Sequence, residues 1–127
     1  MSKYFVNDIE IMHHKFGVNR IVRNMSPEVL GEFLKFRIAC LEEELNETKM
    51  AAAAKDYDGV VDGIIDGVVF ALGTLDAFDV DTIKAWTRVY EANIIKTAGE
   101  KESRKNNFGF PDLIKGPDWK PPCHKDN

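Results

Sequence analysis

Apolar residues between positions 60 and 72 come in adjacent pairs that repeat every four residues. They are Val60 and Val61, Ile64 and Ile65, Val68 and Val69, and then Leu72. Residues four apart return to nearly the same side of an α-helix, and the pairs make the apolar stripe wider than a one-sided surface helix needs. We therefore expect a helix that is central to the fold.

Gly59, Gly63 and Gly67 form a second row at the same spacing of four. Each glycine costs about 0.8–1 kcal/mol relative to alanine in a helix interior, so a packing gain should offset it. We expect another helix to approach closely along this row.

A long helix is expected before the central one, because Ser26, Pro27 and Glu28 form a strong helix start. Serine can accept a hydrogen bond from a backbone amide, proline has the φ of a first helical position, and glutamate suits the positive end of the helix dipole. The apolar stripe includes Leu30, Phe33, Leu34, Ile38, Leu41 and Leu45. The alanine run at 51–54 extends the helix towards Lys55, and the next two residues interrupt it.

Two shorter helices complete the expected set. Apolar side chains recur at spacings of three and four over residues 7–16, and Gly17 follows as a stop. Asp81 can cap a last helix that fades near Gly99. Its apolar positions are Ile83, Trp86, Val89, Tyr90 and Ile94.

The length of 127 residues suits one domain with a hydrophobic core, and so do the apolar fraction of 44% and the charged fraction of 30%. Strand-like alternation never lasts long enough to predict a sheet. We expect one all-α domain over 1–127. Its four-helix-bundle-like core spans about 5–98, and an irregular loop and tail cover 99–127.

Charge and cysteine content argue against several classes of protein. With a net charge of −4 and dispersed basic residues, the chain lacks the footprint of a nucleic-acid-binding protein. It has no signal region and no apolar run that could cross a bilayer, so we expect no membrane partner and a cytoplasmic location, or the host cytoplasm for a viral protein. The spacing of Cys40 and Cys123 predicts neither a zinc site nor a disulfide scaffold.

Carboxylates gather on the long helix and on the central helix. Glu43, Glu44 and Glu47 lie on adjacent turns of the long helix, and Asp62 and Asp66 lie one turn apart at the edge of the central apolar stripe. If these two edges face each other, their carboxylates can share a cation. Oxygen ligands favour Mg²⁺, with Mn²⁺ as a substitute. Spacing alone leaves open the alternative of a solvated acidic face.

Candidate phosphate ligands follow towards the end of the chain. Asn93 and Lys96 are three residues apart near the end of the last helix and can meet one phosphate together, although an ordinary polar helix end has the same pattern. Lys101 and Arg104 lie in a donor-rich segment that is suited to closing over a polyanion, or that is simply a flexible basic loop. The other donors of this segment are Ser103, Lys105, Asn106 and Asn107.

The order of these segments resembles the all-α nucleotide pyrophosphohydrolase superfamily, which comprises the MazG-like and phosphoribosyl-ATP pyrophosphohydrolase-like proteins. The resemblance rests on residues 36–47, on 61–74 and on 91–96. The family pairs Glu-x-x-Glu on one helix with Glu-x-x-Asp on the next. Glu44 and Glu47 match the first pair, and Asp66 matches the end of the second.

One position departs from this pattern. The residue three before Asp66 is Gly63 instead of glutamate, and the nearest carboxylate is that of Asp62, four before. Four residues also return to nearly the same helix face, so Asp62 is a reasonable substitute. Whether one ion or two are bound stays open.

The resemblance implies hydrolysis of a nucleoside triphosphate to the monophosphate and pyrophosphate, in a homodimer or a homotetramer built as a dimer of dimers. By this hypothesis Glu44, Glu47, Asp62 and Asp66 hold Mg²⁺, and Glu43 or one ligand carboxylate orients the attacking water. The favoured substrate is dGTP or GTP. The alternatives are dUTP, phosphoribosyl-ATP, or a non-catalytic helical interaction protein with the same fold.

The base of such a nucleotide could lie against the first helix, at Met12, His13 and Phe16. Apolar residues there are equally consistent with a core, and His13 with a packing role. His13 and His14 point about 100° apart, so they cannot bind one ion from one face.

Overall fold

The structure, a computed structural model, describes residues 3–127 and falls into two compact units. The first unit ends at Thr82 and the second runs from Ile83 to Asn127. The chain is mostly helical with little sheet, which confirms the predicted all-α class.

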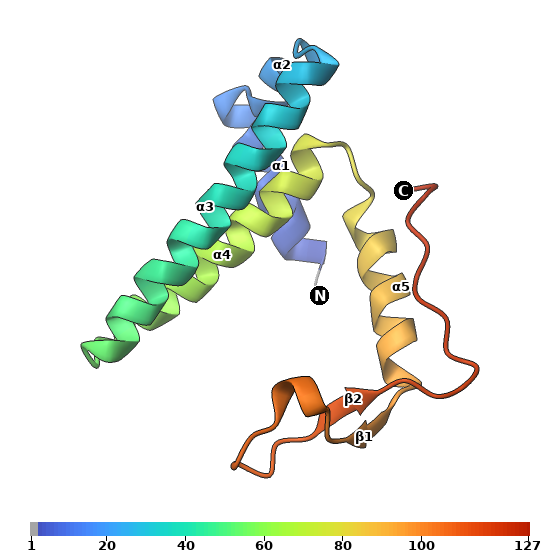
Figure 1. The fold of residues 1–127 in the computed structure, drawn as a ribbon. Coiled ribbons are helices and arrows are strands. Elements are labelled where there is room, and N and C mark those ends of the chain that lie inside the picture. Colours follow the sequence, from blue (N-terminus) through green and yellow to red (C-terminus); the bar gives the residue numbers. More distant parts are fainter. Residues whose placement is uncertain (1–2) are drawn as a thin grey trace. The chain divides into compact units, whose positions relative to one another are not determined.

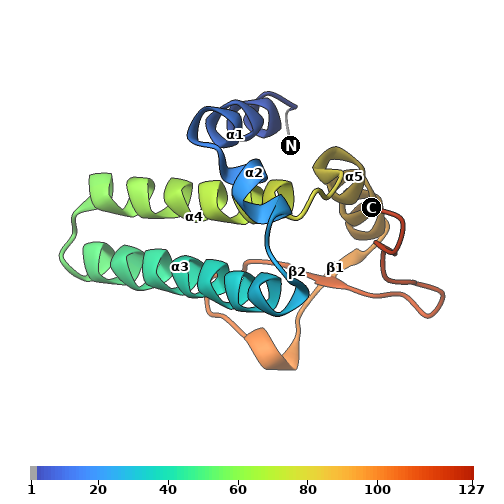
Figure 2. The same ribbon diagram turned by 90° about the horizontal axis from the view of Figure 1, so that it is seen from above.

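The first unit is built from four helices (Figure 1). They are α1 (Lys3–Phe16), α2 (Val18–Arg23), α3 (Pro27–Ala53) and α4 (Tyr57–Ala77). The two long helices, α3 and α4, run antiparallel along their whole length, and α4 lies between α3 and α1 (Figure 2). The expected central helix is therefore the centre of this unit.

Local capping explains where the two long helices begin. The Ser26 hydroxyl accepts a hydrogen bond from the Val29 amide at 3.3 Å, as the start signal predicted. The Asp56 carboxylate accepts one from the Gly59 amide at 3.0 Å. Asp56 was expected only to interrupt α3, whereas it also caps α4 after a turn in which Lys55 has a positive φ of 57°.

The N-terminal helical region differs from the expectation of one short helix. The first helix begins at Lys3, ahead of the expected start at residue 7, and a six-residue helix follows directly after Gly17. Gly17 adopts the left-handed conformation, with φ of 71°, so it turns the chain instead of ending the helical segment.

The second unit contains α5 (Thr82–Ile94), close to the predicted last helix, and a small sheet. Strands β1 (Thr97–Gly99) and β2 (Asp112–Ile114) pair antiparallel, with Ala98 opposite Leu113, and a 3-10 turn, η1 (Glu102–Arg104), lies between them. The predicted irregular segment at 99–127 thus contains one short strand and one 3-10 turn, which the sequence analysis did not predict. Strands of three residues are too short to show a periodicity in the sequence.

Few side chains are deeply buried. The buried apolar residues among those described are Ile9, Val22, Leu72 and Ala77, and no large side chain in this part of the chain is fully buried. Many apolar residues of the predicted stripes stay exposed, including Ile64 and Ile65 of α4. Within residues 3–127, no helix combines the length and the apolar character that crossing a membrane requires.

Candidate active site

The acidic seam, defined as Glu43, Glu44, Glu47 and Asp66, lies where α3 passes α4. Glu44 is half-buried. Burial raises its pKa, and the charges of Glu47, Asp66 and Glu43 raise it further. Because Asp66 belongs to the neighbouring helix, the acidic edges of the two helices face each other closely enough to interact.

Asp62, the proposed replacement for the family's glutamate, lies on α4 but is exposed, and its charge is not among those that act on Glu44. The adjacent Gly63 is buried against α3. A Cβ atom at position 63 would overlap the Thr48 hydroxyl oxygen and lie 3.2 Å from the Thr48 Cβ. Thr48 therefore fills the space that a side chain at position 63 would need.

The glycine row marks close helix approach at two of its three positions. Thr48 of α3 contacts the Gly63 position, and the Ala51 Cβ of the same helix lies 3.1 Å from the Cβ position of Gly59. Nothing lies within 4 Å of the Cβ position of Gly67. The expectation of close approach is thus confirmed within the chain at Gly59 and Gly63, and close packing at Gly67, within or between protomers, stays a prediction.

The acidic seam suits a hard divalent cation in its chemistry, because all its donors are oxygens and they repel one another. Among residues 3–127, however, no three His, Cys, Asp or Glu side chains converge closely enough to hold an ion. The carboxylates interact across the helix pair, and their side chains would have to rotate to share one ion.

Arg37 of α3 forms hydrogen bonds to α4 near the acidic seam. Its Nε donates to the Thr74 hydroxyl at 3.1 Å and one Nη donates to the Phe70 carbonyl at 3.2 Å. The guanidinium also lies 5.0 Å from the centre of the Phe70 ring. Arg37 precedes Glu44 by seven residues, or two helical turns, so this contact fixes the helix pair beside the acidic seam. This role of Arg37 was not predicted, because it depends on the distance between α3 and α4.

The three candidate base-binding residues do not share one environment. His13 is buried, and its Nδ1 lies 2.7 Å from an Asp76 carboxylate oxygen. This environment agrees with a packing role for His13, the alternative to base binding. Met12 and Phe16 are exposed. His13 and Phe16 line a cavity of about 370 Å³ together with basic residues of α1 and α2, but Met12 does not.

The candidate phosphate ligands belong to the second unit, whereas the acidic seam belongs to the first. Asn93 is half-buried. Lys96 Nζ lies 4.8 Å from the centre of the Trp119 ring. Asp112 faces both remaining cations, with Arg104 at 2.8 Å and Lys101 at 4.0 Å. The pKa of Asp112 is lowered by a hydrogen bond from the Leu113 amide and by these two cations.

The first unit is thus an all-α fold in which two antiparallel helices carry the carboxylates of the acidic seam. The family model of phosphoribosyl-ATP pyrophosphohydrolase matches residues 18–93, which is more than half of the chain and includes the acidic seam. The chain belongs to this family, and the superfamily resemblance is confirmed. No match was found among curated proteins or solved structures. Family membership indicates a nucleotide pyrophosphohydrolase.

Proposed function

We propose that the protein is a Mg²⁺-dependent enzyme that hydrolyses a nucleoside triphosphate to the monophosphate and pyrophosphate. The observation that carries this proposal is the placement of Glu43, Glu44 and Glu47 on α3, which packs along α4 and its Asp66. The charge of Asp66 helps to raise the pKa of Glu44, after the larger effects of burial and of Glu47. A cluster of like charges is unfavourable by itself and becomes favourable when it binds a cation. Family membership supplies the reaction class.

The side chains that would hold Mg²⁺ are those of Glu44, Glu47 and Asp66, joined by Asp62 through the exposed edge of α4. When bound, the ion supplies charge neutralisation at the phosphate oxygens. Glu43, or one of the ligand carboxylates, accepts a hydrogen bond from the attacking water and orients it. Glu43, Glu44 and Glu47 are accordingly the proposed catalytic residues.

The remaining substrate contacts follow the same proposal. Asn93, Lys96, Lys101 and Arg104 provide hydrogen-bond donors and positive charge for the phosphates. Phe16 offers an exposed ring for the base, next to His13 in the same cavity. Met12, which lies outside that cavity, is the least supported of the base-binding candidates.

Exposed apolar side chains on the first unit support assembly into a homodimer or a homotetramer. On α4, Val61, Ile64 and Ile65 are 60%, 55% and 55% exposed, and on α3 Phe36 is 61% exposed. Apolar surface of this extent usually marks an interface. Light scattering coupled to size exclusion should give a mass of two or four chains, and a single-chain mass would contradict the assembly.

The substrate is the least determined part of the proposal. We favour dGTP or GTP. The family description favours phosphoribosyl-ATP as the alternative, and dUTP is a third candidate. The cytoplasmic location stays a prediction from the sequence.

The test is a panel of these four triphosphates, assayed for released pyrophosphate and for the monophosphate, with Mg²⁺ and with a chelator. We expect one substrate to be preferred and its turnover to need the metal ion. Release of inorganic phosphate in place of pyrophosphate would contradict the reaction. Absence of turnover with all four substrates in Mg²⁺ or Mn²⁺ would favour a non-catalytic interaction protein with this fold.

A further inference from the structure

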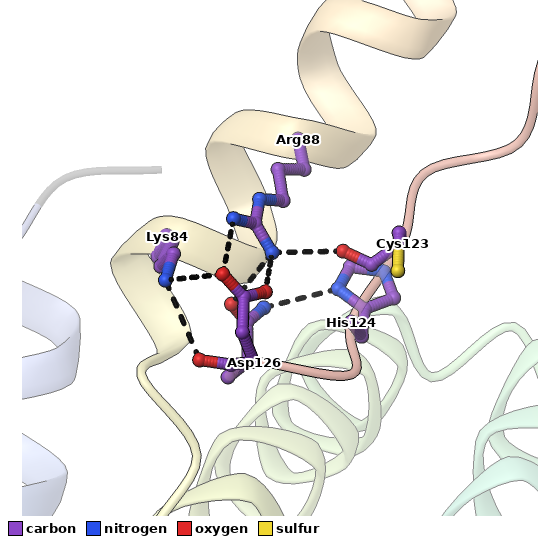
Figure 3. Close-up of polar contacts among 6 residues, drawn as sticks. Lys84, Arg88, Cys123, His124 and Asp126 are labelled. Carbon is purple, nitrogen blue, oxygen red and sulfur yellow. Dashed lines mark hydrogen bonds and ion pairs between the residues drawn. The ribbon is translucent and has the colours of Figure 1, made fainter.

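Asp126 in the tail is held by two cations of α5. Lys84 and Arg88 are four residues apart, so they lie on one face of the helix. One Nη of Arg88 contacts the first carboxylate oxygen of Asp126, and the other Nη lies 3.0 Å from the second oxygen. Lys84 Nζ also lies 3.0 Å from that second oxygen (Figure 3). Both oxygens therefore receive charged donors.

The tail provides further hydrogen-bond acceptors for the Arg88 guanidinium. The same Nη that contacts Asp126 donates to the Cys123 carbonyl at 2.8 Å and to the Asn127 side-chain oxygen at 3.0 Å. The Asn127 amide nitrogen lies 3.1 Å from His124 Nδ1 (Figure 3). The pKa of Asp126 lies far below its usual value because Arg88 and Lys84 donate hydrogen bonds to it, so the carboxylate stays ionised near neutral pH.

A groove of about 650 Å³ lies between α5 and the tail beside this contact. Arg88 and Asp126 line it, Lys120 and Lys125 add two further cations, and Glu91 adds a second carboxylate. The rest of the lining is mostly apolar, and Lys84 lies outside it. The groove therefore leaves room at Arg88 for a ligand larger than a carboxylate.

A planar guanidinium binds carboxylate or phosphate through two parallel hydrogen bonds, and a lysine beside it binds phosphate as a point charge. A carboxylate held at two oxygens by the same donors presents similar atoms with less negative charge. Asp126 therefore occupies a place that fits phosphate.

We propose that Lys84 and Arg88 form a binding site for a phosphate or pyrophosphate group, and that Asp126 is an internal competitor which the anion displaces. The site uses no residue of the acidic seam and needs no metal ion. It therefore stands or falls separately from the proposed reaction.

The test is calorimetric titration of the full chain with sodium pyrophosphate, at constant ionic strength and without divalent cations. Asp126→Asn keeps the size of the side chain and removes its charge, so pyrophosphate affinity should rise about tenfold or more. The matched control is Asp118→Asn, which removes the same charge from an exposed position of the same tail. Adding Arg88→Gln to Asp126→Asn should abolish the gain.

Two results would overturn the proposal. Equal affinity changes in Asp126→Asn and Asp118→Asn would mean that only overall charge matters. A lower melting temperature in Asp126→Asn without any gain in affinity would mean that Asp126 simply anchors the tail.

Unmodified protein provides a second measurement in case Asp126→Asn does not fold. In nitrogen-15 spectra, the Nε–H signal of Arg88 should move during pyrophosphate titration, and no movement at saturation would refute the site. The same titration with an α,β-methylene triphosphate distinguishes the sources of the anion. Binding of pyrophosphate alone assigns the site to the free anion, and binding of both extends it to the phosphates of a nucleotide.

Discussion

Glu44 in the first unit and Asp126 in the second lie in opposite electrostatic environments. In the first unit, burial and the like charges of neighbouring carboxylates raise the pKa of Glu44. In the second, Arg88 and Lys84 lower the pKa of Asp126, and a backbone amide with Arg104 and Lys101 lowers that of Asp112. The first region is thus short of positive charge and can gain it from a bound ion. The second is already neutralised by its own residues, so an external anion must compete for its cations.

The largest expected effect comes from breaking the acidic seam. Glu47→Gln should lower turnover at least about a hundredfold, because removal of one electrostatic contact to the reacting groups typically has this effect. The helical circular-dichroism spectrum should not change. Glu42→Gln, an exposed neighbour outside the acidic seam, is the matched control. Activity in Glu47→Gln equal to that of the wild type would remove the proposed metal site.

A second prediction concerns the close approach of the helices that carry the acidic seam. Gly63→Ala should destabilise the fold by about 1–3 kcal/mol, because the added methyl overlaps the Thr48 hydroxyl. Gly67→Ala should be neutral or stabilise by up to about 1 kcal/mol, since its Cβ position is open. Chemical denaturation measures both. If Gly63→Ala and Gly67→Ala lowered the free energy of unfolding equally, the conformational freedom of glycine, and not the space beside Thr48, would explain the effect at position 63.

A third prediction concerns Asp76, a carboxylate of the first unit that is paired with His13. His13→Ala leaves Asp76 without its buried partner and should destabilise the fold by about 1–3 kcal/mol. His14→Ala, at the exposed neighbouring position, should have little effect. If His13→Ala weakened the free energy of substrate binding by more than it lowered the free energy of unfolding, the result would instead support a base-binding role for His13.

The smallest expected effect is a pH-dependent change in stability. The fold raises the pKa of Glu44, so ionised Glu44 destabilises the fold above that pKa, and the loss disappears as the pH falls below the pKa of the unfolded chain. Without divalent ions, Glu44→Gln should therefore melt at a higher temperature than the wild type near pH 7, and the difference should vanish near pH 4. Adding Mg²⁺ should raise the melting temperature of the wild type more than that of the variant. A difference that is constant with pH would contradict this origin.

Local signals in the sequence predicted most of the helices. Ser26 and Pro27 mark the start of α3 because capping depends on neighbouring residues only. The paired apolar residues likewise identified α4. The helix after Gly17 was missed because a glycine stop and a glycine corner look alike in a sequence. The strands were missed because the pairing of Ala98 with Leu113 depends on residues far apart in the chain.

The site was predicted less completely, for the same reason. Helix periodicity placed Glu44 and Glu47, or Glu43 and Glu47, on one side of α3, and the family resemblance selected Glu44, Glu47 and Asp66. Their roles as metal ligands stay a prediction. The overlap between Gly63 and Thr48 depends on how far apart the two helices lie, and periodicity does not give that distance. The pairing of Arg88 with Asp126, 38 positions later in the chain, has no local signal at all.

The contact between Thr48 and Gly63 also limits how this chain can evolve. A glutamate at position 63 would place its side chain in the volume of the Thr48 hydroxyl, so this substitution should destabilise the helix pair while Thr48 remains. Thr48→Ala would remove the hydroxyl that occupies this volume, so a glutamate at position 63 should be tolerated better together with Thr48→Ala than alone.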